Sequence, residues 1–286
     1  MSEPAVFVTG ATGIVGGAVV RHLLNRDVPV IAAVRSVTDT AMLPAGAVAR
    51  QFDFDSTPAE LTQALVGVDR LFLMRPPPIE NVACYLFPLI DAAQKAQIRQ
   101  IVFLSLQGVQ SNRKTPHHAG EKYLRQQNVP YTFLRPNFFM QNLSTTYAQR
   151  IRDQSEIFVP AGRSRTAFVD ARDIGRVAAR VFTEPGHLRK AYTLSGEQSL
   201  SYSNIADIMT DVLARPIRYS RPTEAEYLAQ LAAEGHPTAY IDVQKMIYRV
   251  VRWNISAFPN RTIRKLTGMP ATTFREFAHD SRTTWQ

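Results

Sequence analysis

Apolar and polar positions follow two alternating patterns along the first half of the chain. Short apolar runs, which are typical of buried parallel strands, alternate with stretches whose apolar residues recur at helical spacing. We expect strands at 5–10, 28–36, 69–78, 99–106 and 129–136, and helices at 13–27, 57–68, 79–98 and 117–128. This alternation predicts an α/β fold with a Rossmann-like, doubly wound parallel sheet.

The regular alternation stops after Pro136. Residues 155–185 carry both strand and helix signals, and 190–196 have the pattern of one more short strand. From residue 200 onward the patterns are mostly helical, and prolines interrupt them. We therefore expect two parts: a first domain at 1–155, and a smaller, mostly helical region at 156–286, of which about 165–195 returns to the sheet.

The composition is that of an ordinary globular protein, with 286 residues, 45% hydrophobic and 20% charged. Cys84 is the only cysteine, which excludes an internal disulfide and a cysteine cluster for a metal ion. We expect no metal site. The chain shows no basic leader and no apolar run long enough for a membrane helix, so a cytoplasmic protein without membrane contact is expected.

The formal net charge of +9 raises the question of a nucleic-acid partner. Lysines and arginines are spread along the chain, usually near acidic residues, and no five-residue basic block occurs. We therefore expect no nucleic-acid partner.

Three glycines follow the first strand in the segment "VTGATGIVGG", at Gly10, Gly13 and Gly16. A strand that turns directly into a helix aims the unpaired N–H groups of the first helical turn at one spot, where an anionic group is favoured. The spacing is a variant of the dinucleotide fingerprint, and the context of strand, turn and helix fits it. The alternative is a tight turn that holds no ligand.

Arg35 ends the second expected strand, about twenty residues beyond the glycines, and no acidic residue occurs between Val28 and Thr38. An acid at this place usually holds the ribose of NAD, whereas an arginine suits the additional phosphate of NADP. The sequence therefore predicts NADP(H) as the cofactor of the first domain. The alternative is a solvated arginine at a strand end.

The chain resembles the short-chain dehydrogenase/reductase superfamily and, within it, the atypical NmrA-like family. The segments that carry the resemblance are "VTGATGIVGG", the strand end at Arg35, "DFD" at 53–55, "LFLMRPPP", "VPYTFLRPNFFMQN" at 129–142 and "FVDARDIGRVAARVF" at 168–182. The resemblance implies these cofactor contacts: Thr9, Gly10, Ala11, Thr12, Gly13, Ile14 and Val15 around the pyrophosphate, Asp53 and Phe54 at the adenine, Met74, Arg75 and Pro76 along the middle, and Pro136, Asn137 and Phe138 by the nicotinamide. Asp53 as a turn residue, Phe54 as core and Pro76 as a strand stop are the alternatives.

Typical members of the superfamily use a Tyr-x-x-x-Lys pair on one helix face to deliver a proton. No tyrosine in this chain has a lysine four residues on, and His117 and Glu121 occupy the expected positions. A carboxylate beside an imidazole raises its pKa, so this pair is a candidate proton donor. The alternative is a histidine at a helix start and a first-turn acid that offsets the helix dipole. Ser105 matches the position of the superfamily's catalytic serine, and a buried serine bonded to backbone is its alternative.

Two functions follow from this reading. The first is an NADPH-dependent reductase that transfers hydride to a small electron-poor or unsaturated substrate, such as a quinone, enone, imine or dye-like molecule. The second is a non-catalytic NADP(H)-sensing regulatory protein of the NmrA type, which the missing Tyr-x-x-x-Lys pair would fit. No motif in 156–286 identifies the substrate or the oligomeric state.

Overall fold

The computed structural model describes residues 4–76 and 81–286, apart from the side chains at 37–39. It divides into two compact units: unit 1 is Met1–Pro136 with Ala171–Leu194, and unit 2 is Asn137–Asp170 with Ser195–Gln286. Residues 137–155, which we assigned to the first domain, thus group with unit 2. The assignment of one domain to a cofactor and the other to a substrate stays a prediction.

Unit 1 is built on a seven-stranded sheet in which every neighbouring pair of strands is parallel. The strand order is β3-β2-β1-β4-β5-β6-β9, so the chain moves outward from β1 to β3 and then crosses to β4 on the other side of β1. The bounds are β1 Ala5–Val8, β2 Val30–Val34, β3 Val48–Gln51, β4 Val68–Met74, β5 Gln100–Leu104, β6 Tyr131–Pro136 and β9 Lys190–Leu194. The expected doubly wound α/β fold is therefore confirmed.

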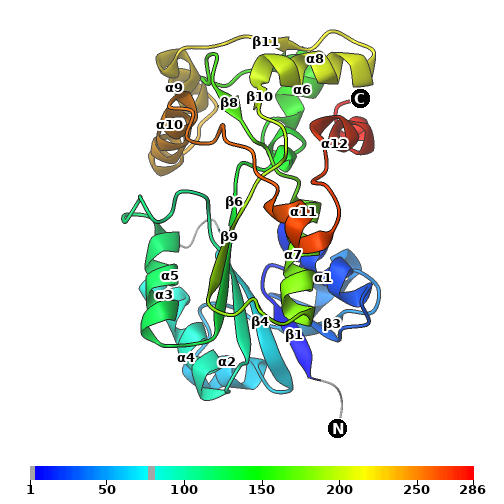
Figure 1. Ribbon diagram of the computed structural model, residues 1–286. Coiled ribbons are helices and arrows are strands. Elements are labelled where there is room, and N and C mark those ends of the chain that lie inside the picture. Colours follow the sequence, from blue (N-terminus) through cyan, green and yellow to red (C-terminus); the bar gives the residue numbers. More distant parts are fainter. Residues whose placement is uncertain (1–3, 77–80) are drawn as a thin grey trace. The chain divides into compact units, whose positions relative to one another are not determined.

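Helices cover both faces of this sheet (Figure 1). Helices α1 and α7 pack against each other on one face, and α2, α4 and α5 lie on the opposite face. The bounds are α1 Ile14–Leu24, α2 Pro58–Ala64, α3 Val82–Tyr85, α4 Phe87–Lys95, α5 Pro116–Gln126 and α7 Ala171–Thr183, with a 3₁₀ turn, η1, at Val37–Met42.

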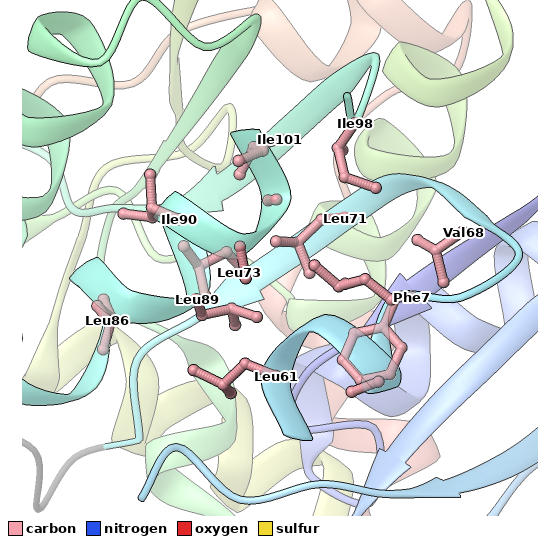
Figure 2. Close-up of a cluster of buried hydrophobic side chains, with 14 of the residues drawn as sticks. Phe7, Leu61, Val68, Leu71, Leu73, Leu86, Leu89, Ile90, Ile98 and Ile101 are labelled. Atoms are coloured by element: carbon pink, nitrogen blue, oxygen red, sulfur yellow. The ribbon is translucent and has the colours of Figure 1, made fainter. Parts of the chain in front are cut away.

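One core of unit 1 lies on the face that α2 and α4 cover. Because successive side chains of a strand point to opposite faces, only alternate residues contribute to it, such as Phe7 from β1 and Leu71 and Leu73 from β4. Leu61 of α2 and Leu89 of α4 meet these residues from the helix side (Figure 2). Each of these five side chains is fully buried, and each such burial stabilises the fold by about 2 kcal/mol.

Unit 2 combines two small sheets with short helices around a second core. Strands β10 and β8 are antiparallel, and β11 and β7 are parallel. Aliphatic and aromatic side chains share this core, and those of Trp285 and Tyr248 are its largest fully buried members. The bounds are β7 Glu156–Ile157, β8 Arg165–Thr166, β10 Leu200–Ser201, β11 Arg218–Tyr219, η2 Met140–Leu143, α6 Ala148–Gln154, α8 Tyr202–Leu213, α9 Glu224–Ala233, α10 Thr238–Arg252, α11 Thr262–Thr267, α12 Phe274–Asp280 and η3 Arg282–Thr284.

Two expectations about elements differ from the structure. Strand β3 was not expected, because its four residues form the exposed edge of the sheet and lack an apolar run. The single helix expected at 79–98 is two helices, α3 and α4, separated at Leu86. Within the described ranges, no helix has the length and apolar character that crossing a bilayer requires.

Candidate functional site

The candidate residues of unit 1 gather at the carboxyl edge of its sheet. In a parallel sheet all strands end at the same edge, and ligands bind where the order of strands reverses. That point lies between β1 and β4, which are neighbours in the sheet. Thr9 follows β1 here, Arg75 follows β4 and Ser105 follows β5.

Thr9 fixes the end of β1 against the end of β4. Its side chain is fully buried, and its hydroxyl donates to the carbonyl of Phe72 at 3.1 Å and accepts from the backbone N–H of Met74 at 2.8 Å. Gly10 then adopts a φ of +64°, which favours glycine, and its carbonyl accepts from the N–H of Gly13 at 2.9 Å. The predicted glycine turn is thus a compact, hydrogen-bonded loop.

Helix α1 begins directly after this turn with its first N–H groups uncapped by side chains. Its N-cap residue is Gly13, which has no side chain, and no acidic residue stands in the first turn. Gly13 and Ile14 are exposed, whereas Ala11 and Val15 are buried and Thr12 is partly buried. A helix start of this kind fits a bound phosphate or pyrophosphate.

Arg35 and Asp53 line one pocket of about 540 Å³ at the edge of unit 1. The Nε of Arg35 lies 3.9 Å from an Oδ of Asp53, and the Arg35 side chain is 78% exposed. Asp53 also accepts from the N–H of Asp55 at 3.2 Å, as a turn residue does. Arg35 is therefore only loosely held and is available to an anionic ligand. The remaining pocket residues are Arg50, Gln51, Phe52, Ser56, Glu60, Gln63, Ala64 and Val66.

Arg50 is a second cation in this pocket that sequence reasoning missed. It lies on the edge strand β3, and one of its Nη atoms donates to the carbonyls of Ala64 and Val66 at 2.7 and 2.8 Å. These bonds satisfy carbonyls at the end of α2. The sequence does show a basic residue directly before "QFDFD". That residue reaches the pocket only because 48–51 form strand β3, which we did not expect.

Phe54 was predicted to contact the adenine, and Met74, Arg75 and Pro76 the middle of the cofactor; the structure places them in different surroundings. Phe54 is buried in the core, edge-on to Phe52 with ring centroids 5.0 Å apart, and it does not line the pocket of Arg35. Met74 lies against the glycine turn, because its methyl carbon would be 2.0 Å from a Cβ built on Gly10. Arg75 donates to the carbonyl of Pro76 at 3.1 Å, whereas Pro77 and Pro78 lie outside the described residues.

Glu121 is the centre of a buried ionic cluster. Its side chain is 2% exposed, and one carboxylate oxygen accepts from Ser105 Oγ at 2.7 Å and from Arg135 Nε at 2.8 Å. The other oxygen accepts from Arg135 at 2.6 Å and from Arg125 at 2.9 Å. Burial acts to raise the pKa of Glu121, but the hydrogen bonds from Arg135 and Ser105 and the two guanidinium charges hold that pKa below its usual value.

This cluster corrects the sequence prediction for His117. We expected Glu121 to raise the pKa of His117, but burial and the charge of Arg75 lower it to about 4, and the opposing effect of Glu121 is smaller. The carboxylate of Glu121 is already bonded to Ser105 and the arginines. The shift favours the neutral form of His117 at neutral pH, and its role in proton transfer stays a prediction.

The alternatives for these residues also need correction. The first turn of α5 contains no acidic residue, so Glu121 does not offset the helix dipole there. Ser105 is buried as the alternative reading required, but its hydroxyl donates to a side chain and not to backbone. His118, next to His117, has its Nδ1 3.1 Å from the carbonyl of Val109.

The lowered pKa of His117 makes a prediction about stability and pH. Because the folded pKa is below the unfolded value of 6.5, the unfolded chain binds a proton first, and stability falls as the pH drops through 6.5. Between about pH 7 and about pH 5 the loss from this group is at most about 2 kcal/mol. Urea unfolding of the wild type and of His117→Gln at both pH values measures this loss as the difference in how their free energies of unfolding change with pH. If the free energy of unfolding depends on pH equally in the two proteins, the pKa of His117 is not lowered in the folded protein.

The three residues expected near a nicotinamide span the sequence boundary between the two units, after Pro136. Pro136 ends β6, and its carbonyl accepts from the N–H of Gln107 at 2.9 Å. Asn137 and Phe138 belong to unit 2. The buried amide of Asn137 donates to the carbonyl of Ser256 at 2.9 Å and accepts from the N–H of Phe138 at 2.8 Å. Asn137 therefore fixes backbone in unit 2.

Comparison with known proteins places these features in a family. A model described as the NmrA-like family matches residues 2–278. An NAD(P)H azoreductase from Xenophilus azovorans is 33% identical over 279 residues, which cover 96% of this chain and 96% of the azoreductase.

Two solved structures with bound cofactor are similar over almost the full length. An NADPH-dependent quinone oxidoreductase from Escherichia coli, complexed with NADPH, matches with a TM-score of 0.86 and 28% identity over 96% of this chain and 99% of that one. A triphenylmethane reductase from Citrobacter sp., complexed with NADP(H), matches with a TM-score of 0.86 and 26% identity over 97% and 100%.

Proposed function

The chain belongs to the NmrA-like family, and from this premise we propose that it is an NADPH-dependent reductase. Its substrate is a small electron-poor or unsaturated molecule, of the class that includes quinones, enones, imines and dyes. The names of the relatives support this class, because they are an azoreductase, a quinone oxidoreductase and a dye reductase.

The observation that carries the proposal is the uncapped start of helix α1 at the point where the order of strands in the sheet reverses. Gly13 offers no capping side chain, and the first turn offers no carboxylate to repel a phosphate. Arg35 supplies a guanidinium for the additional phosphate that distinguishes NADPH from NADH. When bound, NADPH would supply the hydride and the redox chemistry of the reaction.

In this proposal the candidate side chains of unit 1 position the reacting groups and do not transfer a proton. We assign His117 the role of a neutral hydrogen-bonding group, because its pKa of about 4 keeps it uncharged. Ser105 and Glu121 act as support, since each is bonded within the buried cluster. An electron-poor acceptor needs less help from a protein acid than a simple carbonyl does, so this site suits quinone-like substrates.

Arg35 gives a direct test of cofactor choice. Arg35→Ala is expected to weaken NADPH binding about tenfold or more and to leave NADH binding within about twofold, because only the phosphate contact is lost. Equilibrium titration of both nucleotides measures the two dissociation constants. The control is Arg99→Ala, which removes another exposed guanidinium, at the amino end of β5. If Arg35→Ala binds NADPH as well as the control does, Arg35 does not select the cofactor.

The activity is tested by steady-state NADPH oxidation with a panel of quinones, azo dyes, enones and imines. A reductase oxidises NADPH only when an acceptor is present. The competing function, an NADP(H) sensor, predicts no oxidation with any acceptor and a change in partner affinity between NADP and NADPH. The relatives named as reductases favour the first outcome.

A further inference from the structure

Unit 2 contains a groove that the proposed cofactor site does not use. Its volume is about 390 Å³, and all of its lining residues belong to unit 2. They come from α6 and the two residues before it, from β7 and the residue after it, from α9 and the residue after it, and from the segment before α10 and the first turn of α10. The groove is lined by Thr146, Tyr147, Gln149, Arg150, Asp153, Gln154, Glu156, Phe158, Tyr227, Gln230, Leu231, Glu234, His236 and Tyr240.

Aromatic rings form much of the wall of this groove. Phe158 and Tyr227 have ring centroids 6.4 Å apart, and the rings of His236 and Tyr240 stack at 4.7 Å. Tyr147 adds a further ring to the lining. A flat aromatic molecule can therefore contact several ring surfaces at once.

Two tyrosine hydroxyls of the wall, those of Tyr147 and Tyr227, are already bonded inside the protein. The hydroxyl of Tyr147 lies 2.5 Å from that of Tyr248, and Tyr227 donates to Gln244 at 3.2 Å. Because these polar ends are satisfied, a ligand in the groove meets the apolar and π surfaces of the rings.

The charged groups beside Phe158 are paired with one another. Arg150 pairs with Glu156 at 2.6 Å, and its guanidinium carbon lies 4.0 Å from the centroid of the Phe158 ring. Glu156 is buried and also accepts from Arg218 at 2.7 Å. Glu156 is therefore fully engaged by the two guanidiniums and is not open to a ligand.

The exposed rim of the groove is acidic. Asp153 pairs with Arg152 at 2.9 Å, but both side chains are nearly half exposed, so water and salt screen this pair. Glu234 accepts from the amide of Gln230 at 2.8 Å and lies 3.6 Å from a ring nitrogen of His236. The ring of His236 is the one that stacks on Tyr240, so the carboxylate of Glu234 lies beside the aromatic wall.

We propose that this groove binds a flat aromatic molecule that carries one positive charge, such as a ring with a quaternary or protonated nitrogen. Ring faces attract a cation through their quadrupoles, and Glu234 adds a negative charge at the rim. An anionic molecule of the same shape would meet two carboxylates, those of Asp153 and Glu234. The site lies wholly in unit 2 and stands apart from the proposed reductase activity.

Three probes with the same two-ring frame test the proposal by calorimetric titration of the full chain, with NADP present to saturate the cofactor site. They are N-methylquinolinium, neutral quinoline and quinoline-4-carboxylate. The cation is expected to bind about tenfold more tightly than the neutral ring, and the anion more weakly than both. Equal binding of cation and neutral ring, tighter binding of the anion, or no binding of the cation would overturn the proposal.

Variants locate the binding in the groove. Glu234→Gln is expected to weaken binding of the cationic probe about threefold, because one negative charge at the rim is lost. Binding of the neutral probe should stay unchanged. Asp242→Asn removes the same charge from an exposed position on α10 outside the lining, and is the matched control. Tyr240→Ala is expected to weaken binding of both the cationic and the neutral probe, because the ring is lost. Tyr240→Phe keeps the ring and should retain the affinity for both. Cation affinity that no groove variant changes would place the binding elsewhere and contradict the proposal.

Discussion

Replacing Gly16 by alanine is expected to abolish tight NADPH binding. A Cβ at this position would lie 2.1 Å from the carbonyl oxygen of Gly10 and 2.5 Å from its carbonyl carbon, which are backbone atoms of the glycine turn. The turn must therefore move away from helix α1, and the first N–H groups of the helix no longer point at one phosphate position. Losing about 3 kcal/mol of such contacts corresponds to about a hundredfold weaker binding. Titration with NADPH measures the change.

Gly17→Ala is the control for this substitution. It adds the same methyl group to the next residue of α1, where the nearest backbone atom, the carbonyl oxygen of Ala11, would be 3.3 Å away. A small shift relieves that contact, so NADPH binding should change by only a few fold. Similar affinities for the Gly16→Ala and Gly17→Ala proteins would mean that the close approach of Gly16 to Gly10 does not shape the cofactor site.

Replacing Glu121 by glutamine is expected to destabilise the protein by about 3 kcal/mol. The change leaves the buried guanidinium of Arg135, whose side chain is 12% exposed, without its carboxylate. The pKa of Glu121 is lowered in the folded protein, so its stabilisation is present at neutral pH and is lost as the pH falls through the folded pKa. Urea unfolding at neutral pH measures the free-energy difference.

Arg125→Met is the matched control for the ionic cluster. The Arg125 side chain is 43% exposed, so its bond to Glu121 is screened by water and its loss should cost less than about 1 kcal/mol. A Glu121→Gln protein as stable as this control would show that the cluster contributes little to the fold.

The arrangement of unit 1 follows closely from the sequence, because buried parallel strands are continuous apolar runs that a linear pattern displays. The sequence pattern did not predict β3, because the exposed edge strand Val48–Gln51 contains no apolar run. Missing that strand also meant missing Arg50 as a member of the pocket of Arg35.

The chemistry around His117 could not be read from the sequence in the same way. The spacing of His117 and Glu121 on one helix suggested a pair, but Ser105 and Arg135 come from two strands and reach Glu121 only in the folded sheet. Burial, which no local pattern reports, then decides the direction of the His117 pKa. The aromatic groove of unit 2 depends in the same way on contacts between distant segments.

A single-turnover measurement tests the central claim most directly. The full chain, loaded with one equivalent of NADPH, is mixed rapidly with an excess of a quinone, and the absorbance of the reduced nicotinamide is followed. The proposed reductase predicts full loss of this absorbance only when the quinone is present, and a slower loss when the transferred position of NADPH carries deuterium. Absorbance that is unchanged by the quinone and by azo and triphenylmethane dyes would contradict the claim.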